Sequence, residues 1–138
     1  MKKNVVITVR GLQPEINADE PIEVVSAGTY MRNKESHYLS YEEADDNGRI
    51  TKNRIKIMPE LIEMVKQGTV ATQMRFALGE KQFACYETPF GEFTLGMLTK
   101  EITLKEEEGL DARLCYSLEI NGEHVSDCEL NIEVRDVL

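Results

Sequence analysis

The sequence lacks several features on which common functional sites depend. Its 138 residues include no tryptophan, four prolines, two histidines and three cysteines. The cysteines, Cys85, Cys115 and Cys128, are odd in number and form no Cys-x-x-Cys pair, which favours a reducing compartment over a disulfide-bonded scaffold. A four-ligand zinc site would need closer spacing or more histidines than His37 and His124. We therefore expect neither a metal nor a cofactor.

No apolar run approaches the roughly 20 residues needed to span a bilayer. The N-terminal segment "MKKNVVITVRG" begins with basic residues, as a secretion signal does, but its short apolar stretch alternates with polar residues. We interpret it as the first strand and expect the protein to be cytoplasmic.

The charge balance is acidic, with 25 acids against 16 bases and a net charge of −9. No basic cluster offsets this charge, so binding to nucleic acid or to an anionic membrane is not expected. Hydrophobic residues make up 41% and charged residues 30% of the composition, as in a globular protein. The length fits a single domain spanning residues 1–138.

Alternation of apolar and polar residues is the dominant pattern, and Gly, Asn, Asp or Pro interrupts it about every ten residues. The Asn-Gly pairs at 47–48 and 121–122 predict tight hairpin turns. Apolar residues change parity within two long segments, which predicts β-bulges near residues 98–100 and between residues 125 and 128. These features predict an antiparallel meander.

The segment "MPELIEMVKQG" (58–68) is ambiguous. Proline at a first-turn position, early glutamates and a closing glycine are typical of a helix. A strand hairpin turning at Gln67-Gly68 is equally compatible with its short length, and strands are expected on both sides.

If nine or ten short strands in one small domain formed an open sheet, its two edge strands and one of its faces would be exposed to solvent. Closure of the sheet into a barrel removes these edges. We therefore predict an all-β fold, a single antiparallel up-and-down β-barrel of about eight to ten strands.

Several short stretches resemble the YwiB-like family of uncharacterised bacterial proteins, which have a calycin-like β-barrel and a domain of unknown function. These stretches are "YLSYEE" (38–43), Gly48, "IK" (55–56), "MRFALG" (74–79), "CYETPFGEF" (85–93) and "TKEI" (99–102). The resemblance implies a calycin/lipocalin-like barrel that holds one small ligand or is filled by side chains, and it implies strands over 58–68. It implies no reaction. The Gly-x-Trp signature of lipocalins is absent, because the chain has no tryptophan.

The stretch "SHYLSYEEADDNG" (36–48) holds the most unusual chemistry. As an EF-hand with Gly48 at loop position 6, it would place Arg54 at the position of the bidentate glutamate, so we interpret its acidic end as a hairpin tip. In a strand, Tyr38 and Tyr41 lie on opposite faces. The face with Leu39 and Tyr41 is the more apolar, and the inward face stays open between the two.

The candidate ligand-binding residues are three of the five tyrosines and one arginine. They are Tyr38, Tyr41, Tyr86 and Arg75, and Arg75 has small neighbours that leave room beside it. Arg75 is also compatible with an outward ion pair at the barrel rim. No catalytic residue is proposed, since no nucleophile elbow, phosphate-binding loop or dinucleotide fingerprint occurs. An enzyme would need a cavity where His37 or His124 meets an acid.

Two functions are compatible with these patterns. The first is non-catalytic binding of a small, partly apolar molecule in the barrel interior. The second is an interaction module that binds a protein partner or forms a homodimer through a barrel face, since Val6, Val25, Met31 and Leu98 have the outward parity.

Overall fold

Ten β-strands make up the fold in the computed structural model, which describes residues 2–12, 21–68, 71–88 and 91–137. None of the described residues forms a helix long and apolar enough to cross a membrane. The strands are β1 (Lys3–Leu12), β2 (Pro21–Asn33), β3 (Ser36–Ala44), β4 (Ile50–Met58), β5 (Leu61–Gln67), β6 (Thr72–Ala77), β7 (Lys81–Thr88), β8 (Gly91–Lys105), β9 (Leu110–Ile120) and β10 (Glu123–Asp136).

The strands form one antiparallel sheet in the order β6-β5-β4-β3-β2-β1-β10-β9-β8-β7. Every strand pairs with its neighbours in sequence, except that β6 and β7 do not pair, and β1 pairs with β10. The sheet therefore curls into a nearly closed barrel with one seam between β6 and β7. The all-β, up-and-down barrel predicted from alternation is confirmed, whereas a calycin-like relationship stays a prediction.

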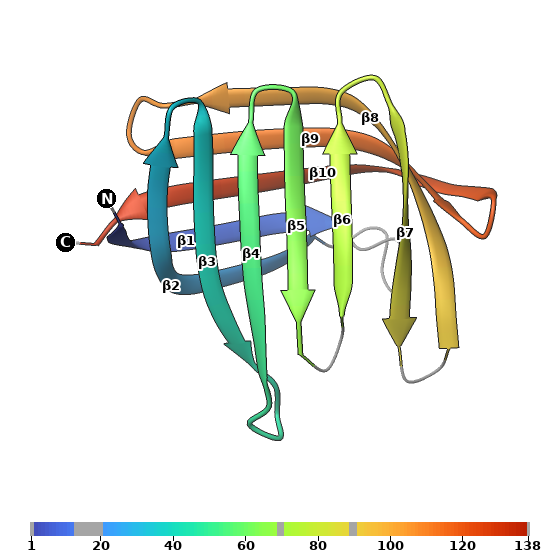
Figure 1. Ribbon diagram of the computed structural model, residues 1–138, viewed down its shortest axis with the longest axis horizontal. Helices are drawn as coiled ribbons and strands as arrows, with labels where there is room; N and C mark the ends of the chain where they lie inside the picture. The colour runs from blue at the N-terminus through green and yellow to red at the C-terminus, as the bar shows by residue number, and fades with distance from the viewer. Residues whose placement is uncertain (1, 13–20, 69–70, 89–90, 138) are drawn as a thin grey trace.

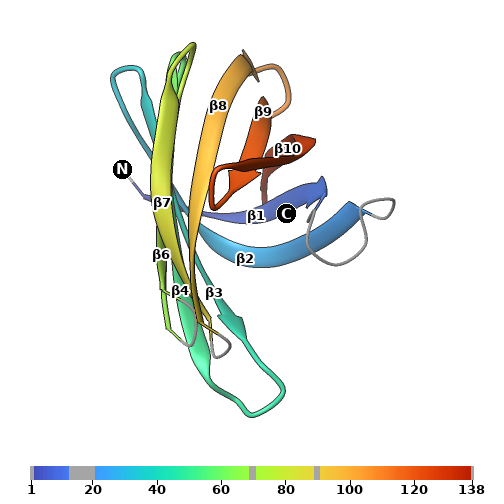
Figure 2. The ribbon, with the colours of Figure 1, turned by 90° about the vertical axis from the view of Figure 1, so that its right-hand side faces the viewer.

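The barrel is flattened into two layers whose strands cross steeply. In Figure 1, β3 to β7 run vertically in front, while β1, β9 and β10 run almost horizontally behind them. Figure 2 shows the two layers from the side and the β3–β4 hairpin projecting beyond the rear layer. The long strands β2 and β8 bend and contribute to both layers.

Glycine permits the close packing where β2 approaches β3. A Cβ atom on Gly28 would lie 2.4 Å from the Ser40 carbonyl oxygen and 2.6 Å from Ile7 Cδ1. The predicted bulges are confirmed, since the register shifts between Thr99 and Glu101 in β8 and between His124 and Ser126 in β10. The Asn121-Gly122 turn is also confirmed, with positive φ at both residues.

The core lies between the two layers and consists of the inward residues of each alternating strand. Its largest completely buried apolar side chains come from both layers and are Phe76, Ile7, Leu39, Ile57, Ile62, Met97, Leu114 and Ile132. The ambiguous segment 58–68 forms a strand, β5, which ends at Gln67 where the hairpin turn was predicted and pairs with β6 beyond it. A turn between Met58 and Leu61 joins β5 to β4 as well. Burial of Ile62 against this core outweighs the local helix signals.

The seam between β6 and β7 is held at the connection of the two strands. The amide nitrogen of Gly79 donates to the Thr99 carbonyl oxygen at 2.9 Å, and that of Leu78 donates to the Glu60 carbonyl oxygen at 3.0 Å. These bonds join the β6–β7 connection to β8 on one side and to the β4–β5 turn on the other.

Candidate functional site

Strand β3 carries two of the predicted ligand-binding residues, and their side chains point to opposite faces of the sheet. Tyr41 points inward and is 5% exposed, beside the buried Leu39, whereas Tyr38 is half-buried and faces outward. The more apolar face therefore points inward, as its composition indicated. Since the two tyrosines lie on opposite faces, they do not line one pocket.

The other two predicted residues do not join Tyr41 either. Arg75 is exposed on the outer side of β6, opposite Glu63 of β5 in register, and makes no ion pair among the described residues. Tyr86 lies in β7 opposite Phe93 of β8, and its side chain is outside the described part of the structure.

Four polar residues form a row across the inner face of the front layer, which we call the inner polar row. Tyr41 pairs with Asn53, Asn53 with Lys66, and Lys66 with Thr72, so one residue comes from each of β3, β4, β5 and β6. Residues in register on adjacent strands lie about 5 Å apart on the same face. Hairpin connections between successive strands thus bring together residues that are well separated in the sequence.

Burial distinguishes this row from an ordinary surface row. Asn53 is 2% exposed and Thr72 is 8% exposed, and polar side chains rarely reach such burial without firm hydrogen bonds. The Asn53 amide nitrogen donates only long bonds, at 3.4 Å to Glu43 Oε1 and 3.5 Å to the Thr51 carbonyl oxygen. The hydroxyl groups of Tyr41 and Thr72 have no hydrogen-bond partner among the described residues.

These hydroxyl groups are not completely enclosed by protein atoms. In the described part of the chain, the only side-chain polar atom that is both fully enclosed and without a partner is Thr99 Oγ1. The Tyr41 and Thr72 oxygens are buried less completely, so a water molecule or a ligand group can touch them.

Burial also controls the ionisation of the row. It raises the pKa of Tyr41 to about 12, with a smaller contribution in the same direction from the Glu43 carboxylate. Tyr41 is thus a neutral hydrogen-bond donor and acceptor at physiological pH. Lys66 is half-buried in the same row and makes no ion pair among the described residues.

The next inward row is apolar. Met64 pairs with Met74, and both side chains are half-buried against the core beside Leu39 and Ile55. Methionine has three rotatable bonds and adapts to irregular shapes. On the inner face, a row of flexible apolar side chains therefore lies directly beside the inner polar row, two residues away along each strand.

A histidine and an acid do approach each other, but not in an accessible cavity. His37 is 2% exposed, and its Nδ1 lies 2.7 Å from the Tyr30 hydroxyl oxygen. Burial lowers the pKa of His37, with an opposing contribution from Glu106, whose Oε1 lies 4.0 Å from Nε2. Arg32 donates to that same Glu106 oxygen at 2.8 Å. His37 is a buried structural residue, and the exposed Glu106 that approaches it is already held by Arg32.

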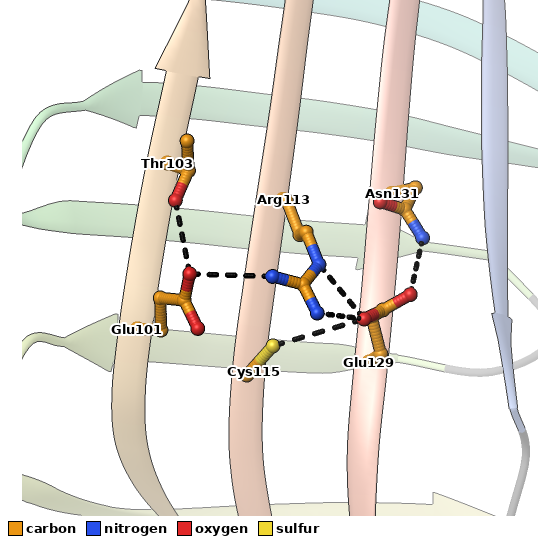
Figure 3. A network of polar contacts seen from close by, with 6 residues as sticks. All are labelled: Glu101, Thr103, Arg113, Cys115, Glu129 and Asn131. Carbon is orange, nitrogen blue, oxygen red and sulfur yellow. Dashed lines mark hydrogen bonds and ion pairs between the residues drawn. The ribbon is translucent and has the colours of Figure 1, made fainter.

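A second polar cluster lies on the outer face of the rear layer. Figure 3 shows Arg113 of β9 between Glu101 and Glu129, at 3.2 Å and 2.6 Å. Asn131 donates to Glu129 as well, and burial raises the pKa of the neighbouring Cys115 thiol. Arg113 is paired with two carboxylates, so the cluster keeps a net negative charge, and Cys115 is kept as an unreactive thiol.

The described residues include no group of three or more His, Cys, Asp or Glu side chains placed to hold a metal ion.

The four apolar residues that were expected on the outer face of the barrel lie on that face. Val25 is 60% exposed, while Val6, Met31 and Leu98 are half-buried on the outward parity. A protein partner or homodimer at these residues stays a prediction.

Sequence reasoning found Tyr41 but missed Asn53, Lys66 and Thr72. Once β3 to β6 are paired as successive hairpins, the three residues line up with Tyr41 on the inward parity.

Comparison with known proteins identifies the family. Residues 7–132 match a family described as a domain of unknown function, DUF1934. Over 127 residues the chain is 31% identical to the uncharacterized beta-barrel protein YwiB of Bacillus subtilis (strain 168), covering 89% of this chain and 88% of that protein. The crystal structure of the ywiB protein from Bacillus subtilis matches with a TM-score of 0.71 and 26% identity, covering 96% of this chain and 92% of that one. The chain therefore belongs to the DUF1934 family of YwiB-like β-barrel proteins.

Proposed function

We propose that the protein binds a small, partly apolar molecule without catalysis, and that the inner polar row holds the polar end of this molecule. The observation that carries the proposal is the burial of Tyr41, Asn53 and Thr72 in one row without firm hydrogen bonds inside the protein. An unpaired buried polar group costs about 1–3 kcal/mol. A ligand that supplies the missing hydrogen bonds offsets this cost.

The row offers complementary groups to one polar ligand end. The hydroxyl groups of Tyr41 and Thr72 donate or accept, the Asn53 amide does both, and the Lys66 ammonium favours an acceptor or an anion. Met64 and Met74 adjoin the row and would contact the apolar part of the ligand. This combination of a few polar groups with an apolar lining is typical of small-molecule sites.

The experiment uses hydroxyl deletions that preserve shape. The double variant Tyr41→Phe/Thr72→Val removes two hydroxyl groups of the row. Its control, Thr8→Val/Thr94→Val, removes two hydroxyl groups from outward positions of β1 and β8.

Native mass spectrometry of protein purified from a bacterial host, followed by extraction, would identify molecules that co-purify. The proposal expects an adduct on the wild-type protein and on the control, and its loss from Tyr41→Phe/Thr72→Val. Wild-type protein without an adduct, or equal retention by both double variants, would contradict it.

A further inference from the structure

An outer groove crosses strands β2 to β5, which lie side by side in the front layer (Figure 1). Its volume of about 370 Å³ lies within the range of small-molecule sites. The outward side chains that line this β2–β5 groove are Thr29 and Met31 of β2, Tyr38 and Ser40 of β3, Arg54 and Lys56 of β4, and Glu63 and Val65 of β5, with Lys2 beside them.

The charge of this groove is opposite to that of the whole protein. Lys2, Arg54 and Lys56 line it against one acid, Glu63, whereas the chain as a whole carries 25 acids and 16 bases. Arg75 extends the positive region, because it lies opposite Glu63 on the next strand. An isolated positive region on an acidic surface attracts anions selectively.

The cations of the β2–β5 groove are not held in ion pairs, although Glu63 lies in register between Lys56 and Arg75. Among the described residues, Arg54 donates only to the neutral Gln67 side chain, at 3.4 Å, and Lys2, Lys56 and Arg75 form no ion pair. An anion entering the groove would therefore gain charge-assisted hydrogen bonds without breaking existing ones.

The groove on the rear layer differs in its charge balance. It is larger, about 610 Å³, but four acids (Glu23, Glu101, Asp111 and Glu133) line it against three bases (Arg10, Lys105 and Arg113), and Arg113 is held by Glu101 and Glu129. An anion binding beside Arg113 would compete with two carboxylates that are already in place. Size alone thus does not identify the better anion site.

The β2–β5 groove also has an apolar floor next to the cations. Tyr38 pairs with Lys56 across β3 and β4, and the Lys56 Nζ lies 5.8 Å from the centre of the Tyr38 ring. Met31 and Val65 are half-buried on either side. Arg54 and Lys56 are two residues apart on one strand face, so their Cα atoms lie about 7 Å apart.

We propose that the β2–β5 groove is a second binding site and that it takes a small organic anion, a carboxylate, sulfonate or phosphate ester with an apolar group. Arg54 and Lys56 bind the anionic group, and the apolar part lies on Tyr38 between Met31 and Val65. This site is on the opposite face of the front layer from the inner polar row, so either site can exist without the other.

The test is an NMR titration of the 15N-labelled full chain with three probes. Naphthalene-2-sulfonate carries both a negative charge and an apolar ring, 2-naphthol carries the ring without the charge, and inorganic sulfate carries charge without the ring. The sulfonate is expected to bind saturably, to shift the amide signals of residues 29–31, 38–40, 54–56 and 63–65, and to bind at least tenfold more tightly than either of the other probes.

Two charge deletions and one control locate the site. Arg54→Gln and Lys56→Gln are each expected to weaken sulfonate binding about tenfold, which is the effect of one charge-assisted contact. Arg10→Gln makes the same change in net charge on the rear-layer groove and is expected to leave the affinity unchanged. Equal effects of all three variants, or no saturable shifts on β2 to β5, would overturn the proposal.

A fourth probe tests the size of the occupant. A peptide of ten glutamates presents an extended polyanion. If it bound more tightly than the sulfonate to the same strands, the assignment to a small molecule would be wrong and an acidic protein segment would be the occupant.

Discussion

Replacement of Tyr41 by phenylalanine tests the inner polar row even while its ligand is unidentified. The Tyr41 side chain is 5% exposed and its ring packs in the core, while its hydroxyl group makes no hydrogen bond among the described residues and is not completely enclosed. Deletion of the oxygen thus removes a polar group that folding partly desolvates and leaves the packing unchanged. We expect Tyr41→Phe to raise the free energy of unfolding by about 1 kcal/mol at pH 8, or the melting temperature by about 3–5 °C.

Ionisation provides a second signature of the same residue. The pKa of Tyr41 is about 12 in the folded protein and near 10 in the unfolded chain. Because the folded pKa is the higher, the contribution of Tyr41 to stability is complete below pH 10 and is lost as the pH rises from 10 towards 12. At pH 11 the wild-type protein has lost on the order of 1 kcal/mol of its free energy of unfolding in this way. Tyr41→Phe has no phenol to ionise at this position, so its stability does not change for this reason.

Urea unfolding at pH 8 and at pH 11 measures both effects, with Tyr38→Phe as a control that keeps Tyr41. The stability difference between Tyr41→Phe and the wild type should roughly double from pH 8 to pH 11, and Tyr38→Phe should follow the wild type. A Tyr41→Phe variant that is less stable than the wild type at pH 8 would show that the hydroxyl has a strong partner within the protein. That result would refute the argument for the inner polar row.

Three further predictions concern the rest of the barrel. Gly28→Ala should lower the free energy of unfolding, measured in urea, by about 2–4 kcal/mol, because its Cβ would lie 2.4 Å from a backbone oxygen. Gly48→Ala, at a φ of +79° with nothing within 4 Å of the added Cβ, should lower it by about 1 kcal/mol. Similar costs for the two variants would contradict the close approach of β2 and β3. Thr99→Val should raise the free energy of unfolding by about 1 kcal/mol, since its hydroxyl is enclosed without a partner, and a loss of stability would reveal an unrecognised bond. Burial lowers the pKa of His37 below 6.5, so its contribution to stability is complete above pH 6.5 and is lost as the pH falls below that value. His37→Phe should abolish this loss in unfolding curves measured between pH 7.5 and 5, and curves parallel to the wild type would contradict the prediction.

The strands and turns were largely predictable from the sequence because their causes are local. Alternation alone separates the inward Leu39 and Tyr41 from the outward Tyr38, and the bulge near Thr99 follows from a change of parity. The segment around Ile62 shows the limit of local rules. Its capping and proline signals favour a helix, and only burial against the opposite layer makes it a strand.

The candidate sites were less predictable because they depend on register between strands. The sequence indicates Tyr38 as a candidate ligand-binding residue, but the cations beside it in the β2–β5 groove come from another strand. Asn53 and Thr72 have no distinctive sequence context, and their importance arises from their burial beside Tyr41.

The sequence by itself determined the period of two, the turns, the bulges and hence the class of fold, since each depends on the conformational preferences and polarity of neighbouring residues. Only the tertiary structure decided that β1 pairs with β10 and leaves a seam between β6 and β7, which polar side chains share a buried row, and which cations form no ion pair among the described residues. The physical reason is that burial and charge pairing depend on contacts between residues far apart in the chain, and those contacts exist only after the sheet has curled.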